Sequence, residues 1–452
     1  MGRPAASPEE SVVKPPIIDL IGIGFGPANL ALAVALDEAG FSGSVHFIEA
    51  RPAFAWQPTM LLRGSDIQHN PLRDLITPVN PRSRFGFVNY LHQSGRFFDY
   101  LNLGSAYPLR REFAHYVEWV SEHFSHLVSY GHTVTGLQVV HGAGADRLLQ
   151  VDCADGTRYL ARAAVIGPGR SANIPEPFTG LLGETIFHLS DYLPKITQLS
   201  QPEKIVVVGA SQSAVEIMLD LDGRFPQAEI HGLMRGYGYR LKDTSPFTGE
   251  IYFPQFTDYF HAASWDGRMA LSRELRSTNY SAADADVINQ LYLRRYESRL
   301  EGRPGHLDII NNADIRRCIS AGGKTRLTIQ DRYTQTIREL AADAVVLATG
   351  FLDLGSGGQR ELLHPLLTEL CNEYEFHPVQ GLAVARDYSL VGPDAPPVYL
   401  NGLCESSHGF GDAGSFSLLS IRARDIATSV AQRLDRRAPI RPPPKLATAL
   451  RA

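Results

Sequence analysis

A glycine-containing turn near the start of this 452-residue chain has the residue types of a phosphate-binding loop. It lies between an apolar run at 17–23 and a helix-like stretch, and it reads Gly22-x-Gly24-x-Gly26-Pro27. Such a turn lets the backbone approach a pyrophosphate, and the helix N-terminus adds free N–H groups and the positive end of a dipole. Glu49 ends the next predicted strand, at 44–49, where its carboxylate can accept hydrogen bonds from both ribose hydroxyls. An acid there disfavours a 2′-phosphate, so this unit predicts a site for an adenosine without one.

A second turn of similar design follows a strand predicted at 204–208 and leads into another helix. Its characteristic residues are Gly209, Ser211, Gln212 and Ser213. The acid is missing here, and Arg235 falls within one residue of the position that Glu49 fills in the first unit. Because a guanidinium can bind a 2′-phosphate with two hydrogen bonds, this unit predicts NADPH rather than NADH.

The cysteines help to decide which reaction two bound dinucleotides would carry out. They are scattered at Cys153, Cys318, Cys371 and Cys404 and form no C-x-x-C pair, so we expect neither a redox dithiol nor a zinc site. Without a dithiol, two dinucleotide units imply direct hydride transfer from NADPH to a flavin, which makes FAD the expected occupant of the first unit. Reaction of the reduced flavin with molecular oxygen is the expected next step.

The order of strands, turns and helices predicts an α/β fold with two Rossmann-like dinucleotide-binding domains and a smaller, mostly helical substrate-binding region. Further strands are expected at 229–234 and 344–347, and a final helix at 415–434. We expect an FAD-binding domain from 17–198 and 346–432, and an NADPH-binding domain at 199–345 with the helical region inserted at about 237–303. Proline-rich ends at 1–16 and 433–452 predict a flexible lead and tail.

Composition excludes several classes of protein. A hydrophobic content of 44% and a charged content of 20% are typical of a soluble globular protein, and a net charge of −5 gives no support for nucleic-acid binding. No apolar run reaches the roughly 18 to 20 residues of a membrane span, and the start of the chain lacks a signal-peptide core. We therefore expect a cytoplasmic protein.

Beyond the two turns, several segments of the chain resemble the microbial N-hydroxylating flavin monooxygenases, the ornithine and lysine N-hydroxylases of siderophore biosynthesis. The resemblance covers about 17–432 and is carried by IGIGFGPANL at 21–30, FGFVNYL at 85–91, DTSPF at 243–247, TNY at 278–280 and DAVVLATG at 343–350. It implies that NADPH reduces FAD, that oxygen forms a hydroperoxide at flavin C4a, and that the distal oxygen passes to the lone pair of a substrate amine, without a metal. It also implies catalytic roles for Gln68 and Asn279, and cofactor contacts for Trp56, Met60 and Gly350.

Residues at substrate-facing positions of the family depart from its usual pattern. Arg73 replaces a lysine, Gly249 replaces an asparagine, and cations stand at His69, Arg294 and Arg295 in place of small or apolar residues. Added cations and a lost amide suit a short substrate with more negative charge. We therefore expect Arg73, His69, Arg294 and Arg295 to bind the carboxylates of L-aspartate. On this ground the chain looks closest to the aspartate N-hydroxylase, or nitrosuccinate synthase, branch, whose products are N-hydroxyaspartate and nitrosuccinate.

Other functions stay open on sequence alone. The substrate could be L-ornithine or L-lysine, the enzyme could oxygenate sulfur or a ketone, or the protein could bind FAD without catalysing turnover. The partners implied are a small amino-acid substrate, molecular oxygen and further copies of the chain in a dimer or tetramer, with no nucleic acid and no membrane.

Overall fold

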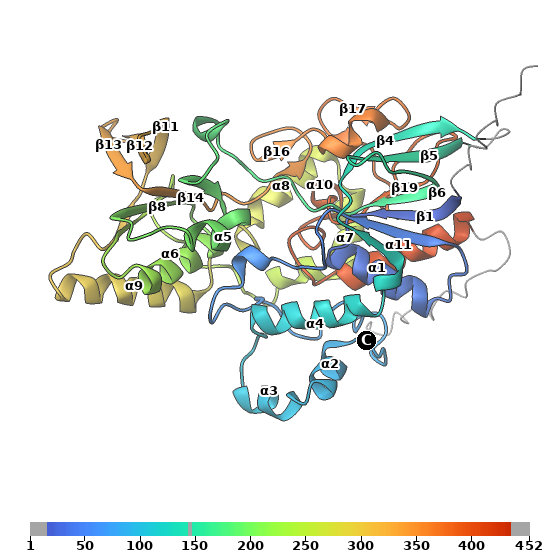
Figure 1. The fold of residues 1–452 in the computed structure, drawn as a ribbon, viewed down its shortest axis with the longest axis horizontal. Coiled ribbons are helices and arrows are strands. Elements are labelled where there is room, and N and C mark those ends of the chain that lie inside the picture. The colour runs from blue at the N-terminus through green and yellow to red at the C-terminus, as the bar shows by residue number, and fades with distance from the viewer. Residues whose placement is uncertain (1–15, 143–146, 435–452) are drawn as a thin grey trace, which may run out of the picture.

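The computed structural model describes residues 16–142 and 147–434 and is built on two separate parallel sheets (Figure 1). The lead and tail predicted at 1–16 and 433–452 lie outside the described residues, apart from residues 16, 433 and 434. The predicted α/β class with two Rossmann-like sheets is confirmed.

The first sheet joins a parallel half to an antiparallel edge. Its strand order is β3 (Val128–Tyr130), β2 (Val45–Glu49), β1 (Ile17–Ile23), β6 (Arg158–Ile166), β5 (Arg147–Cys153) and β4 (Val134–His141), and β19 (Val398–Leu400) also pairs with β6. The pairs of β1 with β2 and β6 are parallel, whereas β5 pairs antiparallel with both β4 and β6. β1 is central, and its residues are buried from Leu20 onward.

The second sheet is parallel throughout. Its order is β10 (Leu307–Ile310), β9 (Glu229–Leu233), β8 (Lys204–Val208), β14 (Ala344–Leu347) and β7 (Ile186–His188). An antiparallel sheet of β11 (Ala313–Ala321), β12 (Lys324–Asp331) and β13 (Ile337–Ala342) precedes β14. Two short pairs follow, β15 (Asp353–Leu354) with β16 (Arg360–Glu361) and β17 (Phe376–His377) with β18 (Gly381–Leu382). The strands expected at 204–208 and 344–347 are confirmed residue for residue.

One group of helices belongs with the first sheet, and another lies between β9 and β10 in the sequence. The first group comprises α1 (Pro27–Glu38), α2 (Phe87–Gln93), α3 (Phe97–Leu103), α4 (Arg110–Glu122) and the last helix α11 (Leu419–Leu434). The second sheet carries α5 (Tyr192–Ile196) and α6 (Gln212–Arg224), and the predicted helical segment contains α7 (Pro254–Ala262), α8 (Trp265–Glu274) and α9 (Ala285–Leu300). A short helix, α10 (Glu405–His408), precedes α11.

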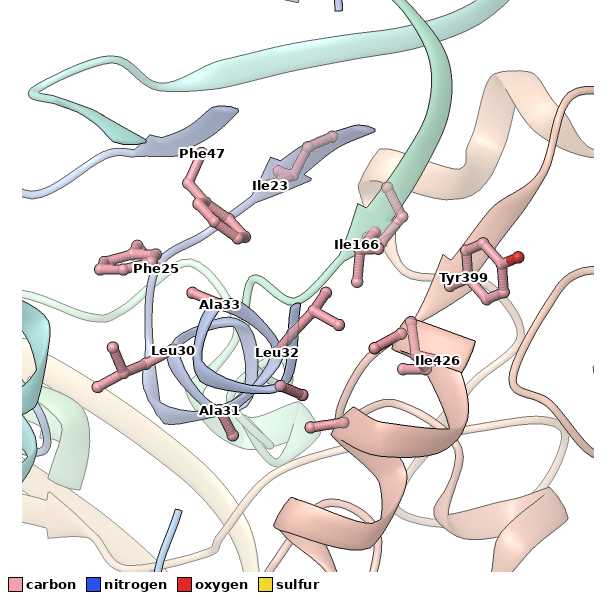
Figure 2. Packing of buried hydrophobic residues seen from close by; sticks show 14 of the residues in the cluster. Ile23, Phe25, Leu30, Ala31, Leu32, Ala33, Phe47, Ile166, Tyr399 and Ile426 are labelled. Atoms are coloured by element: carbon pink, nitrogen blue, oxygen red, sulfur yellow. The ribbon is translucent and has the colours of Figure 1, made fainter. Parts of the chain in front are cut away.

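Helix α1 is buried on every side. Its residues from Asn29 to Leu36 are all buried because α1 lies between the first sheet, α4 and α11. In Figure 2, Ala33 points toward Phe25 and Phe47, Leu32 points toward Ile166 of β6, and Leu30 and Ala31 project from other sides of α1. The chain thus returns at its C-terminal end, through β19 and α11, to close the core that α1 began.

A buried polar chain fixes the glycine turn that precedes α1. Asn29 Nδ2 donates to the carbonyl oxygens of Gly24, at 2.7 Å, and Ile23, at 3.1 Å. Asn401 Nδ2 donates to Asn29 Oδ1 at 2.9 Å, and Arg422 Nε donates to Asn401 Oδ1 at 2.7 Å. The turn is therefore tied to α11, although the two are nearly 400 residues apart in the sequence.

Replacement of Arg422 by methionine should lower the free energy of unfolding by about 3 to 5 kcal/mol. Arg422 Nη1 lies 2.9 Å from Asp412 Oδ1, and their side chains are only 2% and 1% exposed. Arg422→Met would leave a buried carboxylate without its counter-charge. Urea denaturation measures the change, and Arg424→Met is the control because Arg424 sits on the same helix with its side chain 35% exposed. Equal losses in the two variants would contradict the assigned role of the pair.

Candidate functional site

A cavity of about 1780 Å³ connects the carboxyl ends of the strands of both parallel sheets. Pockets for one small ligand are usually about 300–1,000 Å³, so this cavity has room for more than one. Most residues chosen from the sequence line it: Gly24, Gly26, Pro27, Glu49, Trp56, Met60, Gln68, His69, Arg73, Gly209, Ser211, Gln212, Ser213, Arg235, Asn279 and Gly350. Gly22, Arg294 and Arg295 are not among its lining residues.

Each glycine of the first turn has its own geometric role. Gly24 has a φ of +81°, and a β-carbon added to it would lie 2.5 Å from the carbonyl oxygen of Gly167. Gly26 is the N-cap of α1, has no side-chain capping bond, and has nothing within 4 Å of an added β-carbon. Gly22 lies in β1, where an added β-carbon would come 2.1 Å from the Phe47 ring. Gly22 therefore serves the packing of β1 on β2, while Gly24 and Gly26 shape the cavity wall.

Glu49 is held beside this turn by backbone donors. Its Oε2 accepts from the Phe25 N–H at 2.7 Å, and its Oε1 accepts from the Arg51 N–H at 2.9 Å. The fixed carboxylate keeps lone pairs for ribose hydroxyls, and the open space at Gly26 lies next to free helix N–H groups. This donor and acceptor set fits the adenosine diphosphate part of FAD.

The second turn fits a phosphorylated dinucleotide. A β-carbon on Gly209 would lie 2.4 Å from the carbonyl oxygen of Ala348, so glycine allows β8 and β14 to end close together. Ser211 is the N-cap of α6 and makes no side-chain capping bond, which leaves helix N–H groups available to a pyrophosphate. Arg235 follows β9 at the cavity wall and is exposed, as a partner for a 2′-phosphate should be.

Gln68 lies between the two nucleotide-binding units, and residues of the second unit hold its side chain in place. Its backbone is left-handed, with φ at 59°, which costs on the order of 1 kcal/mol in a residue other than glycine. Its Nε2 donates to Asp284 Oδ2 at 2.5 Å, and the Asp284 N–H donates to Gln212 Oε1 at 2.9 Å. Strain and a fixed side-chain partner together are typical of a residue whose position serves function. The Gln212 side chain, predicted to touch the cofactor, is used in this bridge.

A buried ion pair lies behind Gln68. Arg110 of α4 donates to both oxygens of Glu216 on α6, each at 2.9 Å, and their side chains are 10% and 5% exposed. Arg110 also donates to the carbonyl oxygens of Met60 and Asp66. Asp284, Arg110 and Glu216 were not found from the sequence, because a lone charged residue gives no sign of a partner in a distant segment of the chain.

Asn279 retains an unused donor at the cavity wall. Its side-chain nitrogen is buried and has no hydrogen-bond partner among the described residues. A β-carbon on Gly414 would lie 2.8 Å from that nitrogen, so glycine at 414 keeps the space beside the amide open. A buried donor without a partner costs about 1–3 kcal/mol unless a ligand completes it. The predicted catalytic role of Asn279 stays a prediction that this geometry favours.

Arg73 is placed to bind an anion in the cavity. Its Nη1 donates to Ser417 Oγ at 3.1 Å, and its guanidinium lies 5.6 Å from the centre of the Tyr252 ring. An arginine has five N–H donors, so most of them stay available to a carboxylate.

His69 does not fit its predicted role as a carboxylate binder. Burial lowers its pKa to about 4, so the ring is neutral near pH 7. Its Nδ1 lies 2.8 Å from the carbonyl oxygen of Ile67, which can only accept, so the proton sits on Nδ1 and Nε2 has none to donate. The ring stacks on Phe416 with centroids 5.6 Å apart. His69 is an aromatic wall residue.

Arg294 and Arg295 also do not fit the predicted substrate role. Both lie on the face of α9 that turns toward α6 and β10. Arg294 lies 3.8 Å from Asp222, and Arg295 lies 3.1 Å from Asp308. The two arginines therefore complete ion pairs on the outer side of the second sheet, away from the cavity.

Residues 16–142 and 147–434 contain no group of three or more His, Cys, Asp or Glu side chains that could hold a metal ion. Within the same ranges, no helix has the length and apolarity needed to cross a bilayer.

Comparison with known proteins gives one consistent family. A family model described as L-lysine 6-monooxygenase/L-ornithine 5-monooxygenase matches residues 16–353. The L-ornithine N(5)-monooxygenase of Burkholderia cepacia is 39% identical, with 87% of this chain and 90% of that protein covered. The L-ornithine N(5)-monooxygenase of Pseudomonas aeruginosa is 35% identical, with 92% and 94% covered.

Solved structures agree over nearly the whole chain. The reduced ornithine hydroxylase of P. aeruginosa superimposes with a TM-score of 0.85 at 33% identity, covering 92% of this chain and 100% of that one. The Kutzneria ornithine N-hydroxylase, solved with reduced FAD, NADP⁺ and L-ornithine, gives the same TM-score, identity and coverage. The L-lysine 6-monooxygenase of Pseudomonas syringae has a TM-score of 0.81 at 34% identity, with 92% and 100% covered.

Two glycine variants should separate the shape of the first turn from its ligand contact. Gly24→Ala should destabilise the protein and reduce its flavin content, because φ is +81° and the new β-carbon meets Gly167. Gly26→Ala should leave unfolding within about 0.5 kcal/mol of the wild type but still reduce flavin content, because its β-carbon points into open cavity. Flavin absorbance per protein and thermal denaturation measure both effects. Full flavin occupancy in Gly26→Ala would remove that position from the pyrophosphate site.

His69 should make stability depend on pH. Its pKa is about 4 when folded against an ordinary value of 6.5, so the unfolded chain takes up the proton first. The contribution is fully present above pH 6.5 and is lost as the pH falls toward 4, for a total of about 3 kcal/mol. Denaturation of the wild type and His69→Gln between neutral and acidic pH isolates this contribution from those of other buried histidines. Parallel pH profiles would show that His69 does not titrate as described.

Proposed function

The chain belongs to the L-lysine 6-monooxygenase/L-ornithine 5-monooxygenase family and is a flavin-dependent amino-acid N-monooxygenase, and on that premise we propose that it hydroxylates the side-chain amine of L-ornithine. Its cofactors are FAD and NADPH, which match the two turns described above. The homo-oligomer and the cytoplasmic location expected from the sequence stay predictions.

The position of Arg73 is the main structural support for L-ornithine as the substrate. Among the cations predicted to bind the substrate, Arg73 lies at the cavity wall and keeps free guanidinium N–H donors. Tyr252 and Ser417 flank it. One guanidinium suits one α-carboxylate, and ornithine has a single carboxylate at the far end from its reacting amine. The relatives that act on L-ornithine support the same substrate.

L-aspartate, which the substitution pattern favoured, lacks this support. The relatives and structures described above are ornithine or lysine enzymes, and none is an aspartate enzyme. Of the residues predicted to bind its carboxylates besides Arg73, Arg294 and Arg295 form ion pairs with Asp222 and Asp308 outside the cavity, and His69 is neutral. The nitrosuccinate synthase branch is therefore not part of the proposal.

Residues of the chain bind and orient the ligands and exclude water from the cavity. When bound, the reduced flavin activates oxygen for transfer to an amine lone pair. Gln68, held by Asp284, offers an amide at the cavity wall, and Asn279 offers an unused N–H from the opposite segment. Trp56 and Phe416, with ring centroids 5.2 Å apart, form an apolar wall that keeps water from the reacting atoms.

Arg73→Met should raise the KM for L-ornithine by about tenfold to a hundredfold, because a charge-assisted hydrogen bond contributes about 1.5–3 kcal/mol. Flavin reduction by NADPH should be unchanged. Putrescine, which is ornithine without its carboxylate, should be turned over equally poorly by wild type and variant. Arg294→Met is the matched control, because it removes a charge outside the cavity.

A substrate panel tests the proposal itself. Hydroxylamine formation coupled to NADPH oxidation should be highest with L-ornithine, lower with L-lysine and absent with L-aspartate. Coupled turnover of L-aspartate but not of L-ornithine would overturn the proposed substrate while leaving the enzyme class intact.

A further inference from the structure

A cluster of arginines lies on a part of the cavity wall that neither nucleotide turn accounts for. Arg170, Arg276 and Arg360 all line the cavity. They come from three segments: the loop after β6, the turn before Asn279, and β16. The guanidinium groups of Arg170 and Arg276 lie 5.7 and 5.6 Å from the centre of the Tyr280 ring. The cluster is thus organised around one aromatic side chain next to a candidate catalytic residue.

Arg170 is fully compensated by acids. Its Nη1 lies 3.0 Å from Asp353 Oδ1 and 3.8 Å from Glu405 Oε2, and it donates to the Tyr280 hydroxyl at 3.0 Å. The Tyr280 hydroxyl donates to Glu405 Oε2 at 2.7 Å. Burial raises the pKa of Glu405, and the neighbouring Asp353 raises it further. Asp353 and Glu405 therefore form their ion pairs with Arg170.

Arg276 and Arg360 have neutral partners instead. Arg276 Nη2 donates to Gln359 Oε1 at 2.6 Å, and its Nε donates to Ser281 Oγ at 3.1 Å. Arg360 Nη1 donates to Ser406 Oγ at 2.9 Å, and its guanidinium lies 5.6 Å from the centre of the Trp265 ring. In the part of the chain that the structure describes, neither guanidinium has a carboxylate oxygen within the 4.0 Å of an ion pair. Each therefore keeps most of its five N–H donors.

Gln359 brings these two arginines together. It accepts the hydrogen bond from Arg276, it precedes Arg360 in the chain, and its backbone is left-handed with φ at 63°. Burial lowers the pKa of Arg360, and the like charge of Arg276 adds to this effect, while Asp353 and Glu405 act in the opposite direction. Strained backbone and two neighbouring cations that lack an ion-pair partner both cost free energy, which a bound anion would offset.

We propose that Arg276 and Arg360 form a second anion subsite of the cavity, which binds a phosphate or carboxylate group across the gap between the segment before Asn279 and strand β16. Planar guanidinium groups match either oxyanion with paired hydrogen bonds. Because Arg73 is assigned the single carboxylate of L-ornithine, we expect the anion to be a phosphate of the dinucleotide or a free ion. The subsite is separate from Arg73 and Arg235 in every case.

Calorimetric titration of the FAD-loaded enzyme with inorganic phosphate tests the subsite directly. Arg276→Gln and Arg360→Gln should each weaken binding by about tenfold, and Arg276→Lys and Arg360→Lys should retain most of it because they keep the charge. Arg294→Gln is the matched control outside the cavity and should bind phosphate as the wild type does. Flavin content and thermal denaturation verify that each variant is folded.

The same titration identifies the source of the anion. Loss of the arginine-dependent phosphate binding in the presence of NADP⁺ assigns the subsite to the dinucleotide. Its loss with L-ornithine but not with putrescine would show that the amino-acid carboxylate binds here rather than at Arg73. Binding that survives both assigns it to a free anion. Phosphate binding that is absent in the wild type, or unaffected by both glutamine variants, would overturn the proposal.

Discussion

The ion pair between Arg110 of α4 and Glu216 of α6 sets how the two nucleotide units meet. Both side chains are almost fully buried, so removal of either would leave an uncompensated charge at a cost of about 3–5 kcal/mol. Because Arg110 also binds the carbonyl oxygens of Met60 and Asp66, the pair holds the stretch that leads into Gln68. The strained Gln68 backbone is then stabilised by a rigid wall on one side and by Asp284 on the other.

Acid partners divide the arginines of this protein into two groups. Arg110, Arg170 and Arg422 are buried against carboxylates and hold segments together. Arg73, Arg276 and Arg360 line the cavity with hydroxyl or amide partners, so their charges are available to ligands. Sequence alone does not distinguish these groups, since an arginine's partner comes from elsewhere in the fold. This division, rather than the number of cations, decides which arginines can bind a ligand anion.

Five strands of the two sheets, expected at 17–23, 44–49, 204–208, 229–234 and 344–347, could be predicted because they are short, largely apolar runs bounded by turn residues. Other strands of these sheets, such as β7 and β10, were not predicted. The start of the last helix could not be predicted either. The pattern placed it at residue 415, but α11 begins at Leu419. Ser415 Oγ accepts from the Ser417 N–H at 3.1 Å and lies 2.8 Å from Ser417 Oγ, so local side-chain bonds compete with the first helical turn. This non-helical stretch in turn brings Ser417 to Arg73 and Phe416 to His69.

The geometry of the first nucleotide turn was predictable because it is local: Gly24, Gly26 and Glu49 belong to one strand–turn–helix–strand unit and line the cavity. Substrate residues were not, because their roles depend on distant neighbours. Arg294 and Arg295 lie on the same side of α9 as the buried Leu291 and Ser298, and that side faces α6 and β10 rather than the cavity. His69 lies at the cavity but loses its charge to burial. A cation in the sequence therefore becomes a ligand-binding charge only where the fold leaves it both accessible and without an acid partner.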